Sequence, residues 1–189
     1  MPKTPVVARR PDGTLIFKDR DDFRPNLTPS QCIRAGIFGG IYFNPRGGKP
    51  GILGAQVAID PKEFPKAWFD RLPIEAYAGR RYDASRNRYK VVAGKDQAFW
   101  ESKGWIDPQD PRGWFQWYCR FFMGRRTDDD DRQIKRWAGV AGDKGRWRRF
   151  LINKIKAKHA AYNDESISPV VRQTLLHWAF ELKRHHLHA

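Results

Sequence analysis

An aromatic segment in the middle of the chain, residues 105–126, constrains the fold more than any other part of the sequence. Between positions 114 and 122, large apolar side chains recur at the three- and four-residue spacing that places them on one face of a helix. Three polar residues, Arg112, Gln116 and Arg120, recur every four positions and would form a ridge facing solvent or a bound anion. Because removing this many aromatic rings from water is energetically favourable, we expect a mostly buried helix around which the other segments pack.

Both ends of this helix are marked by residue type. Asp110 is a typical N-cap, and Pro111 fits the first helical turn. Gly124 is a typical C-terminal stop, and Arg125 and Arg126 would lie where the helix dipole favours positive charge. The pattern therefore predicts a helix that begins just after Asp110 and ends at Gly124.

Capping residues and apolar spacing mark the remaining elements. Further helices are expected after Thr28, after Asp60 as far as Leu72, after Asp96, after the acidic run 128–131, over 146–158 and after Ser168. Short apolar runs at 14–17 and 89–92 suggest strands.

These elements predict a mainly α-helical fold. We expect a single domain of six or seven helices over residues 28–182, with an irregular N-terminal third that has room for a small β-sheet. Residues 1–27 are interpreted as an extended arm and residues 183–189 as a polar tail. A length of 189 residues suits one such domain with a substantial core.

The charge balance indicates an anionic partner. The chain has 36 Lys and Arg against 21 Asp and Glu, a formal net charge of +15, and residues 111–158 alone hold 14 Lys and Arg against five Asp. Nucleic acid is the commonest partner of such a protein, with acidic membranes and phosphorylated small molecules as alternatives. Neither a membrane span nor a signal peptide is recognisable, so we expect an intracellular protein, cytoplasmic or nuclear.

Tryptophan is concentrated in the same part of the chain. Six of the eight tryptophans lie between residues 100 and 147, interleaved with Lys and Arg, as in surfaces that hold phosphates and stack bases. Helical spacing favours a core position for Trp114, Trp117, Trp147 and Trp178. Trp105 and Trp137 lie next to turns and basic residues, and are the candidates for ligand contact.

A glycine-rich loop at 44–51 carries two basic residues, Arg46 and Lys49. Its spacing does not match a P-loop, and no helix clearly follows its lysine. Two interpretations stay open: contact of Arg46 and Lys49 with a phosphate or a nucleic-acid backbone, or a solvated turn.

Groups that carry catalysis or bind metals are sparse. The common hydrolase, zinc and dinucleotide-binding motifs are absent. His177 could act as a base or an orienting donor, and Glu101, Asp107 and Asp110 could converge on a pocket, although the two aspartates are also explained as caps. The run 128–131 fits helix capping better than metal binding, because adjacent carboxylates on one turn diverge. We expect no metal and no cofactor, and whether the protein is an enzyme stays open.

Several blocks of the second half resemble a tryptophan-rich family of uncharacterised proteins. They are Gly-Trp-Phe-Gln-Trp-Tyr-Cys-Arg and Gly-Arg-Arg in the aromatic segment, the following Asp-Arg-Gln-Ile-Lys-Arg-Trp, and Leu-Leu-His-Trp-Ala-Phe at 175–180. No activity carries over from the family to these residues. The resemblance implies only that the blocks belong to one folded unit.

These observations predict a nucleic-acid-binding protein, with DNA favoured over RNA, that uses a basic face interleaved with aromatic rings. The predicted contacts are Arg125, Arg126, Arg132, Lys135, Arg136, Arg146, Arg148, Arg149, Arg46, Lys49, Trp105 and Trp137. One alternative is an enzyme that acts on nucleic acid or a phosphorylated substrate through an aromatic pocket with Asp, Glu or His as acid and base. The other is a basic scaffold that docks an acidic protein.

Overall fold

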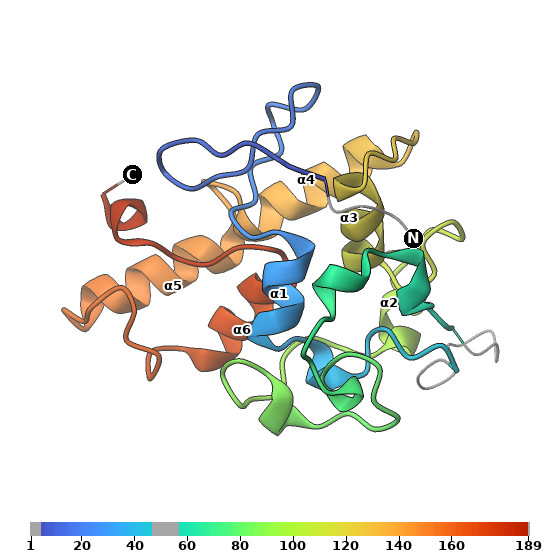
Figure 1. The fold of residues 1–189 in the computed structure, drawn as a ribbon. Coiled ribbons are helices and arrows are strands. Elements are labelled where there is room, and N and C mark those ends of the chain that lie inside the picture. Colours follow the sequence, from blue (N-terminus) through green and yellow to red (C-terminus); the bar gives the residue numbers. More distant parts are fainter. Residues whose placement is uncertain (1–4, 47–56, 189) are drawn as a thin grey trace.

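The computed structural model describes residues 5–46 and 57–188, and their regular structure is mainly helical (Figure 1). The α-helices are α1 (Pro29–Ala35), α2 (Gln97–Ser102), α3 (Trp114–Phe122), α4 (Asp130–Ala141), α5 (Arg146–Ala157) and α6 (Pro169–His177). Short 3₁₀ turns connect them: η1 (Phe38–Gly40), η2 (Pro61–Glu63), η3 (Lys66–Trp68), η4 (Ile74–Ala76), η5 (Ala84–Arg86) and η6 (Arg184–Leu187). The mainly helical class predicted from the sequence is confirmed.

The predicted sheet does not form in the described part of the chain. Its β pairing is limited there to one isolated antiparallel bridge, between Arg9 and Leu15. Residues 89–92 form turns and bends instead of a strand. The first apolar run packs in the core through Leu15 and Phe17, whereas the second ends at the exposed Val92.

Helix α3 lies at the centre of the core, as its aromatic spacing predicted. Trp117, Tyr118 and Cys119 are fully buried. The N-terminal segment packs directly on this helix, because the ring of Phe23 lies within 5.7 Å, centroid to centroid, of the rings of Trp117 and Tyr118. Residues 5–27 thus contribute to the core around α3.

The start of α3 differs from the sequence prediction. The helix begins at Trp114, its N-cap is Gly113 with φ of 81°, and no side chain in the described part of the chain caps it. Asp110 is not the cap because its carboxylate pairs with Arg120 and Arg125. A charge-assisted pair with two guanidiniums is a stronger interaction than a single bond to a backbone N–H. Glycine suits position 113, where φ is positive.

The prediction of a helix from Asp60 to Leu72 was also wrong. Asp60 does cap a turn, since its Oδ1 accepts a hydrogen bond from Lys62 N at 2.8 Å, but the chain forms η2 and η3 in place of a continuous helix. Pro65 explains the interruption, because proline lacks an N–H and favours an extended preceding residue, and Phe64 is extended. The rings of Phe64 and Trp68 still stack in the core, with their centroids 5.5 Å apart.

Helices α4, α5 and α6 pack in succession along the second half of the chain (Figure 1). The acidic run 128–131 leads into α4 and places Asp130 and Asp131 in its first turn, as expected for charge balance at a helix N-terminus. The capping expected of this run was wrong, because the N-cap residue Asp129 makes no side-chain capping bond within the described residues and pairs with Arg132 instead. Asp130 also accepts a hydrogen bond from Trp117 Nε1 at 2.8 Å, which joins α4 to α3. Within the described ranges, no helix is both long and apolar enough to cross a membrane.

Candidate functional site

Four of the predicted phosphate contacts are ion-paired with carboxylates of the protein itself. The pairs are Arg125 with Asp110, Arg126 with Asp19 at 2.6 Å, Arg132 with Asp129 at 2.5 Å, and Arg148 with Asp143 at 2.7 Å. Pairing of this kind neutralises the charge locally and holds the side chain in one position. These four arginines are therefore engaged in ion pairs within the protein and are not free cations of a binding surface.

Two predicted contacts are corrected by burial. Arg148 is 6% exposed, and its guanidinium lies 5.0 Å from the ring centroid of Phe180. Trp137 is 3% exposed, and its Nε1 donates a hydrogen bond to Trp178 O at 2.9 Å. Neither side chain can reach a phosphate or a base without rearrangement, because both are buried against the segment that follows α6.

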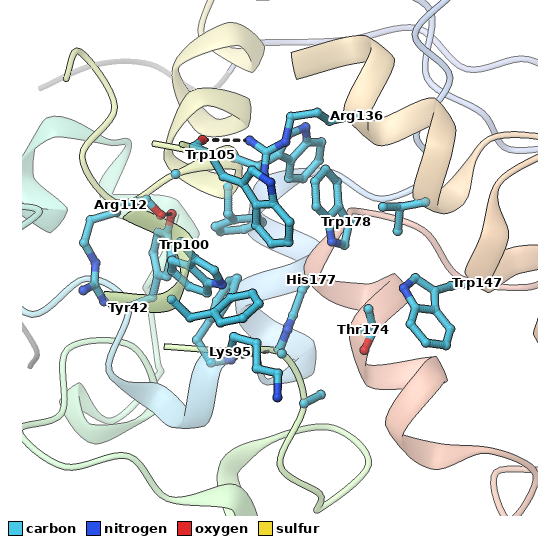
Figure 2. A pocket seen from close by; sticks show the side chains of 18 of the residues that line it. Tyr42, Lys95, Trp100, Trp105, Arg112, Arg136, Trp147, Thr174, His177 and Trp178 are labelled. Atoms are coloured by element: carbon cyan, nitrogen blue, oxygen red, sulfur yellow. Dashed lines mark hydrogen bonds between the residues drawn. The ribbon is translucent and has the colours of Figure 1, made fainter. Parts of the chain in front are cut away.

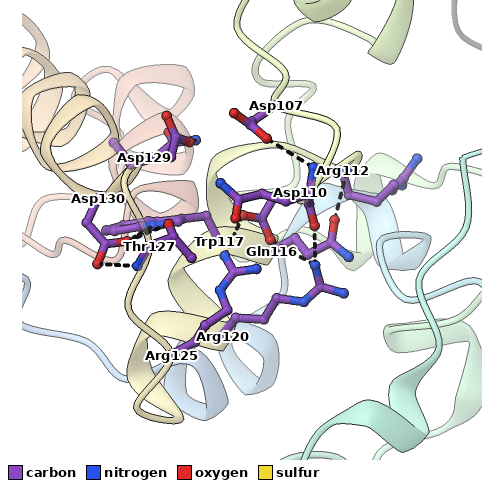
Figure 3. Close-up of polar contacts among 12 residues, drawn as sticks. Asp107, Asp110, Arg112, Gln116, Trp117, Arg120, Arg125, Thr127, Asp129 and Asp130 are labelled. Atoms are coloured by element: carbon purple, nitrogen blue, oxygen red, sulfur yellow. Dashed lines mark hydrogen bonds and ion pairs between the residues drawn. The ribbon is translucent and has the colours of Figure 1, made fainter.

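The residues around Asp110 form a closed polar network rather than a catalytic group (Figure 3). Asp110 is fully buried, and its two oxygens pair with Arg120, at 2.9 Å, and with Arg125. Arg120 also pairs with Glu63, and Asp107 accepts a hydrogen bond from Gln109 N at 3.0 Å. The expected ridge of polar residues on α3 does not exist, since Gln116 is buried and Arg112 turns away from Asp110 in Figure 3.

Three of the predicted cations on α4 and α5 are exposed and without an ion pair among the described residues, whereas Arg126 is exposed but paired with Asp19. Lys135, Arg146 and Arg149 lie on α4 and α5, and none of them forms an ion pair within the described part of the chain. Arg46 is also exposed, at the edge of the described segment 5–46. Lys49 lies outside the described residues.

A cavity of about 680 Å³ opens beside α6 and is walled mainly by aromatic rings (Figure 2). Its volume is that of an ordinary small-molecule site. The lining includes residues from the segment before α3, from α4, from the start of α5 and from α6. The rings are those of Phe38, Tyr42, Phe99, Trp100, Trp105, Trp114, Phe115, Trp147, His177 and Trp178.

Four cationic residues line the same cavity: Lys95, Arg112, Arg136 and Arg146. No aspartate or glutamate is among the described residues of the lining. The described lining therefore carries a net positive charge. It differs in this from the network around Asp110, where the arginines are paired with carboxylates. Such a cavity favours a ligand that combines a planar apolar group with negative charge.

Arg136 illustrates how these cations are held. Its guanidinium carbon lies 5.5 Å from the ring centroids of both Trp105 and Trp178, and its Nη1 donates to Trp105 O at 3.0 Å. Burial, assisted by the nearby charge of Arg132, lowers the pKa of Arg136 to about 10, so the side chain stays charged at neutral pH. The arginine is thus fixed between two rings and forms no ion pair within the described residues, although the charge of Asp129 acts on it from a distance.

Arg112 is a second cation of the cavity that forms no ion pair within the described residues. It is 6% exposed, and its Nε has no hydrogen-bond partner among the described residues. Its guanidinium carbon lies 5.2 Å from the ring centroid of Tyr42, and burial lowers the pKa of the side chain. Arg172 is buried to a similar degree but donates to two backbone carbonyls, of Ile167 and Tyr162. Arg112 differs from Arg172 in that no hydrogen bond from its guanidinium to a described residue is present.

His177 is the neutral polar group of the cavity. Its ring lies parallel to that of Phe38, with centroids 4.1 Å apart, and its Nε2 accepts a hydrogen bond from Phe38 N at 3.2 Å. Burial lowers the pKa of His177 to about 3, so the imidazole is neutral at physiological pH. With Nε2 occupied, His177 cannot take a proton there, which argues against the base role considered from sequence.

The sequence pointed to part of this site and missed the rest. Trp105, predicted from the sequence as a ligand contact, is 41% exposed and lines the cavity. Lys95 and Trp100 were not chosen, although a lysine four residues before an aromatic pair was a readable signal. Trp147 and Trp178 were assigned to the core, but they are only partly buried and their rings border the cavity.

Comparison with known proteins adds no relationship to this geometry. No family model matches the chain, and neither a curated protein nor a solved structure is significantly similar to it.

Proposed function

We propose that the protein binds nucleic acid, with an unpaired base in the aromatic cavity and phosphates on cationic side chains around it. The observation that carries this proposal is the cavity lining, which combines aromatic rings with four cationic residues and, in its described part, no carboxylate. Rings stack on bases of any sequence, and Lys and Arg neutralise the phosphates on either side.

A row of exposed cations leads away from this cavity. Arg146 lines the cavity at the first position of α5, and Arg149 and Lys156 follow on the same helical face after three and ten residues. The row spans about 15 Å, long enough to contact several phosphates. None of the three side chains is ion-paired within the described residues, so their charges are free for a polyanion.

A proton-transfer function is less well supported by the same cavity. The described lining offers no carboxylate, and His177 is neutral with its Nε2 already accepting hydrogen bonds. We therefore give binding precedence over catalysis.

Salt-titrated fluorescence anisotropy tests the proposal, using labelled single-stranded DNA, single-stranded RNA and duplex DNA. We expect single strands to bind more tightly than duplex, and affinity to fall steeply with salt. The variant Arg149→Glu/Lys156→Glu should weaken binding to every sequence and lower the slope of log K against log salt by about 2. The same samples are checked for a reaction product of the nucleic acid, which would indicate an enzyme.

A control with the same change in charge is Lys62→Glu/Lys66→Glu, since both residues are exposed on η2 and η3 and neither lines the cavity. This variant should lose much less affinity. Binding that does not respond to salt, no binding at low salt, or equal losses in the two variants would each contradict the proposal.

A further inference from the structure

His177 is a buried polar side chain among the rings of the cavity. It is 6% exposed, and Figure 2 shows it on α6 between Trp178 and Lys95. One face of its ring is covered by Phe38. What the imidazole can offer a ligand therefore depends on which of its nitrogens carries the hydrogen.

The surrounding hydrogen bonds fix that hydrogen on Nδ1. Phe38 N–H donates to Nε2 of His177, and a backbone N–H can only donate. Gln173 is oriented by two further bonds, because its Oε1 accepts from Tyr89 N at 3.1 Å and its Nε2 donates to Gly36 O at 3.0 Å. The same amide nitrogen lies 3.1 Å from His177 Nε2 and donates to it. With Nε2 accepting from two donors, the neutral ring carries its hydrogen on Nδ1.

This Nδ1–H has no acceptor within the described residues. The hydrogen bonds of His177 there all involve Nε2. Nδ1 is also not one of the fully buried polar atoms that lack a partner, so it reaches accessible space, and the cavity is the space that His177 lines. A donor that is fixed in position and unused by the protein is available to a ligand.

Building on the proposed function, we infer that His177 Nδ1–H donates a hydrogen bond to an acceptor on the nucleobase in the cavity. The site then selects planar rings that carry a carbonyl oxygen or an unprotonated ring nitrogen over rings of equal shape that carry neither. A site that holds a polar group for its ligand discriminates against analogues lacking the matching group, since binding these leaves the donor unpaired.

The test uses short oligonucleotides of abasic residues with one base at the centre, so that a single ring is available to the cavity. Thymine is compared with difluorotoluene, and adenine with 4-methylindole, because each second ring keeps the shape but lacks the carbonyl or imine acceptors. A fully abasic strand reports phosphate binding alone. Affinities are measured by anisotropy with the full chain.

We expect at least one natural base to bind about 2- to 10-fold more tightly than its isostere, the range for one hydrogen bond to a neutral donor. In His177→Gln this preference should vanish, while the preference for a base over the abasic strand remains. Glutamine places its Oε1 near the position of Nε2, so it keeps the acceptor for Phe38 N–H and removes the Nδ1–H donor. The matched control is His186→Gln, because His186 is also buried but does not line the cavity. It should keep the preference.

The outcomes separate this inference from the proposed function. If isosteres bind as well as bases but better than the abasic strand, or if His177→Gln keeps the preference, the inference is overturned and base insertion stands. If the abasic strand binds as well as the others, base insertion itself fails. Urea unfolding of both variants confirms that the comparison is made between folded proteins.

Discussion

Two arginine-rich regions of this protein use the same residue type in opposite ways. Around Asp110, at the start of α3, Arg120 and Arg125 meet carboxylates that neutralise them (Figure 3). In the cavity, Arg112 and Arg136 lie beside aromatic rings and form no ion pair within the described residues (Figure 2). The first arrangement stabilises the fold, and the second leaves two guanidiniums without an ion pair in the described part of the chain. The difference shows that the cationic composition of this chain is not a measure of its binding surface.

The largest effect should come from breaking the first region. Asp110→Asn leaves two partly buried guanidiniums without their shared carboxylate, which is expected to reduce the free energy of unfolding by about 3 kcal/mol. Urea unfolding followed by circular dichroism measures this. Nucleic-acid affinity should change little in the folded fraction. A variant as stable as wild type would show that the network contributes little to the fold.

The second expected effect is a loss of stability in acid that comes from the cavity. Burial lowers the pKa of His177 to about 3, against about 6.5 in the unfolded chain. The unfolded state therefore binds the proton first, and stability falls as the pH drops from about 6.5 towards 3. Between pH 7 and pH 4.5 this contribution should be roughly 2 kcal/mol by linkage.

His177→Gln provides the comparison for this pH effect. Its unfolding free energy should depend less on pH over the same range, while His186→Gln, which removes a different buried imidazole with a pKa lowered to about 4, retains the part due to His177. If the unfolding free energies of wild type and His177→Gln depend on pH in the same way, His177 has the same pKa in the folded and the unfolded protein, and the prediction is wrong.

A third, smaller effect is expected on the affinity for single strands when a ring of the cavity is removed. Trp105 is partly exposed at the cavity, so Trp105→Ala should weaken binding to single strands by about tenfold, the loss of one stacked base, with a change in stability below that of Asp110→Asn. Ile74→Ala, at an exposed apolar residue outside the cavity lining, should leave affinity unchanged. Equal affinities for wild type and Trp105→Ala would separate the cavity from binding.

The smallest effect is expected at an exposed pair. Asp19 and Arg126 are paired at 2.6 Å, but Asp19 is well exposed to water. Asp19→Asn should therefore change the unfolding free energy by less than about 1 kcal/mol. A loss as large as that of Asp110→Asn would mean that burial does not separate the two kinds of ion pair.

Local signals in the sequence were accurate where the chain itself carried the cause. The capping box at Thr28 forms as expected, since Thr28 Oγ1 accepts from Gln31 N and Gln31 Oε1 accepts from Thr28 N. The caps at Asp60 and Asp96 also form, although Pro65 prevents the helix expected after Asp60. Asp110 looked equally like a cap, but partners 10 and 15 residues away took its carboxylate.

The sequence by itself determined that this protein is mainly helical, strongly cationic and built around the aromatic helix α3, because helical spacing and charge are local properties of the chain. Only the tertiary structure decided which cations are neutralised and which rings stay open. Residues 95, 112, 136 and 177 lie far apart in sequence and meet at one cavity, and Arg148 and Trp137 turned inward, because long-range packing brings side chains together without leaving a periodic trace.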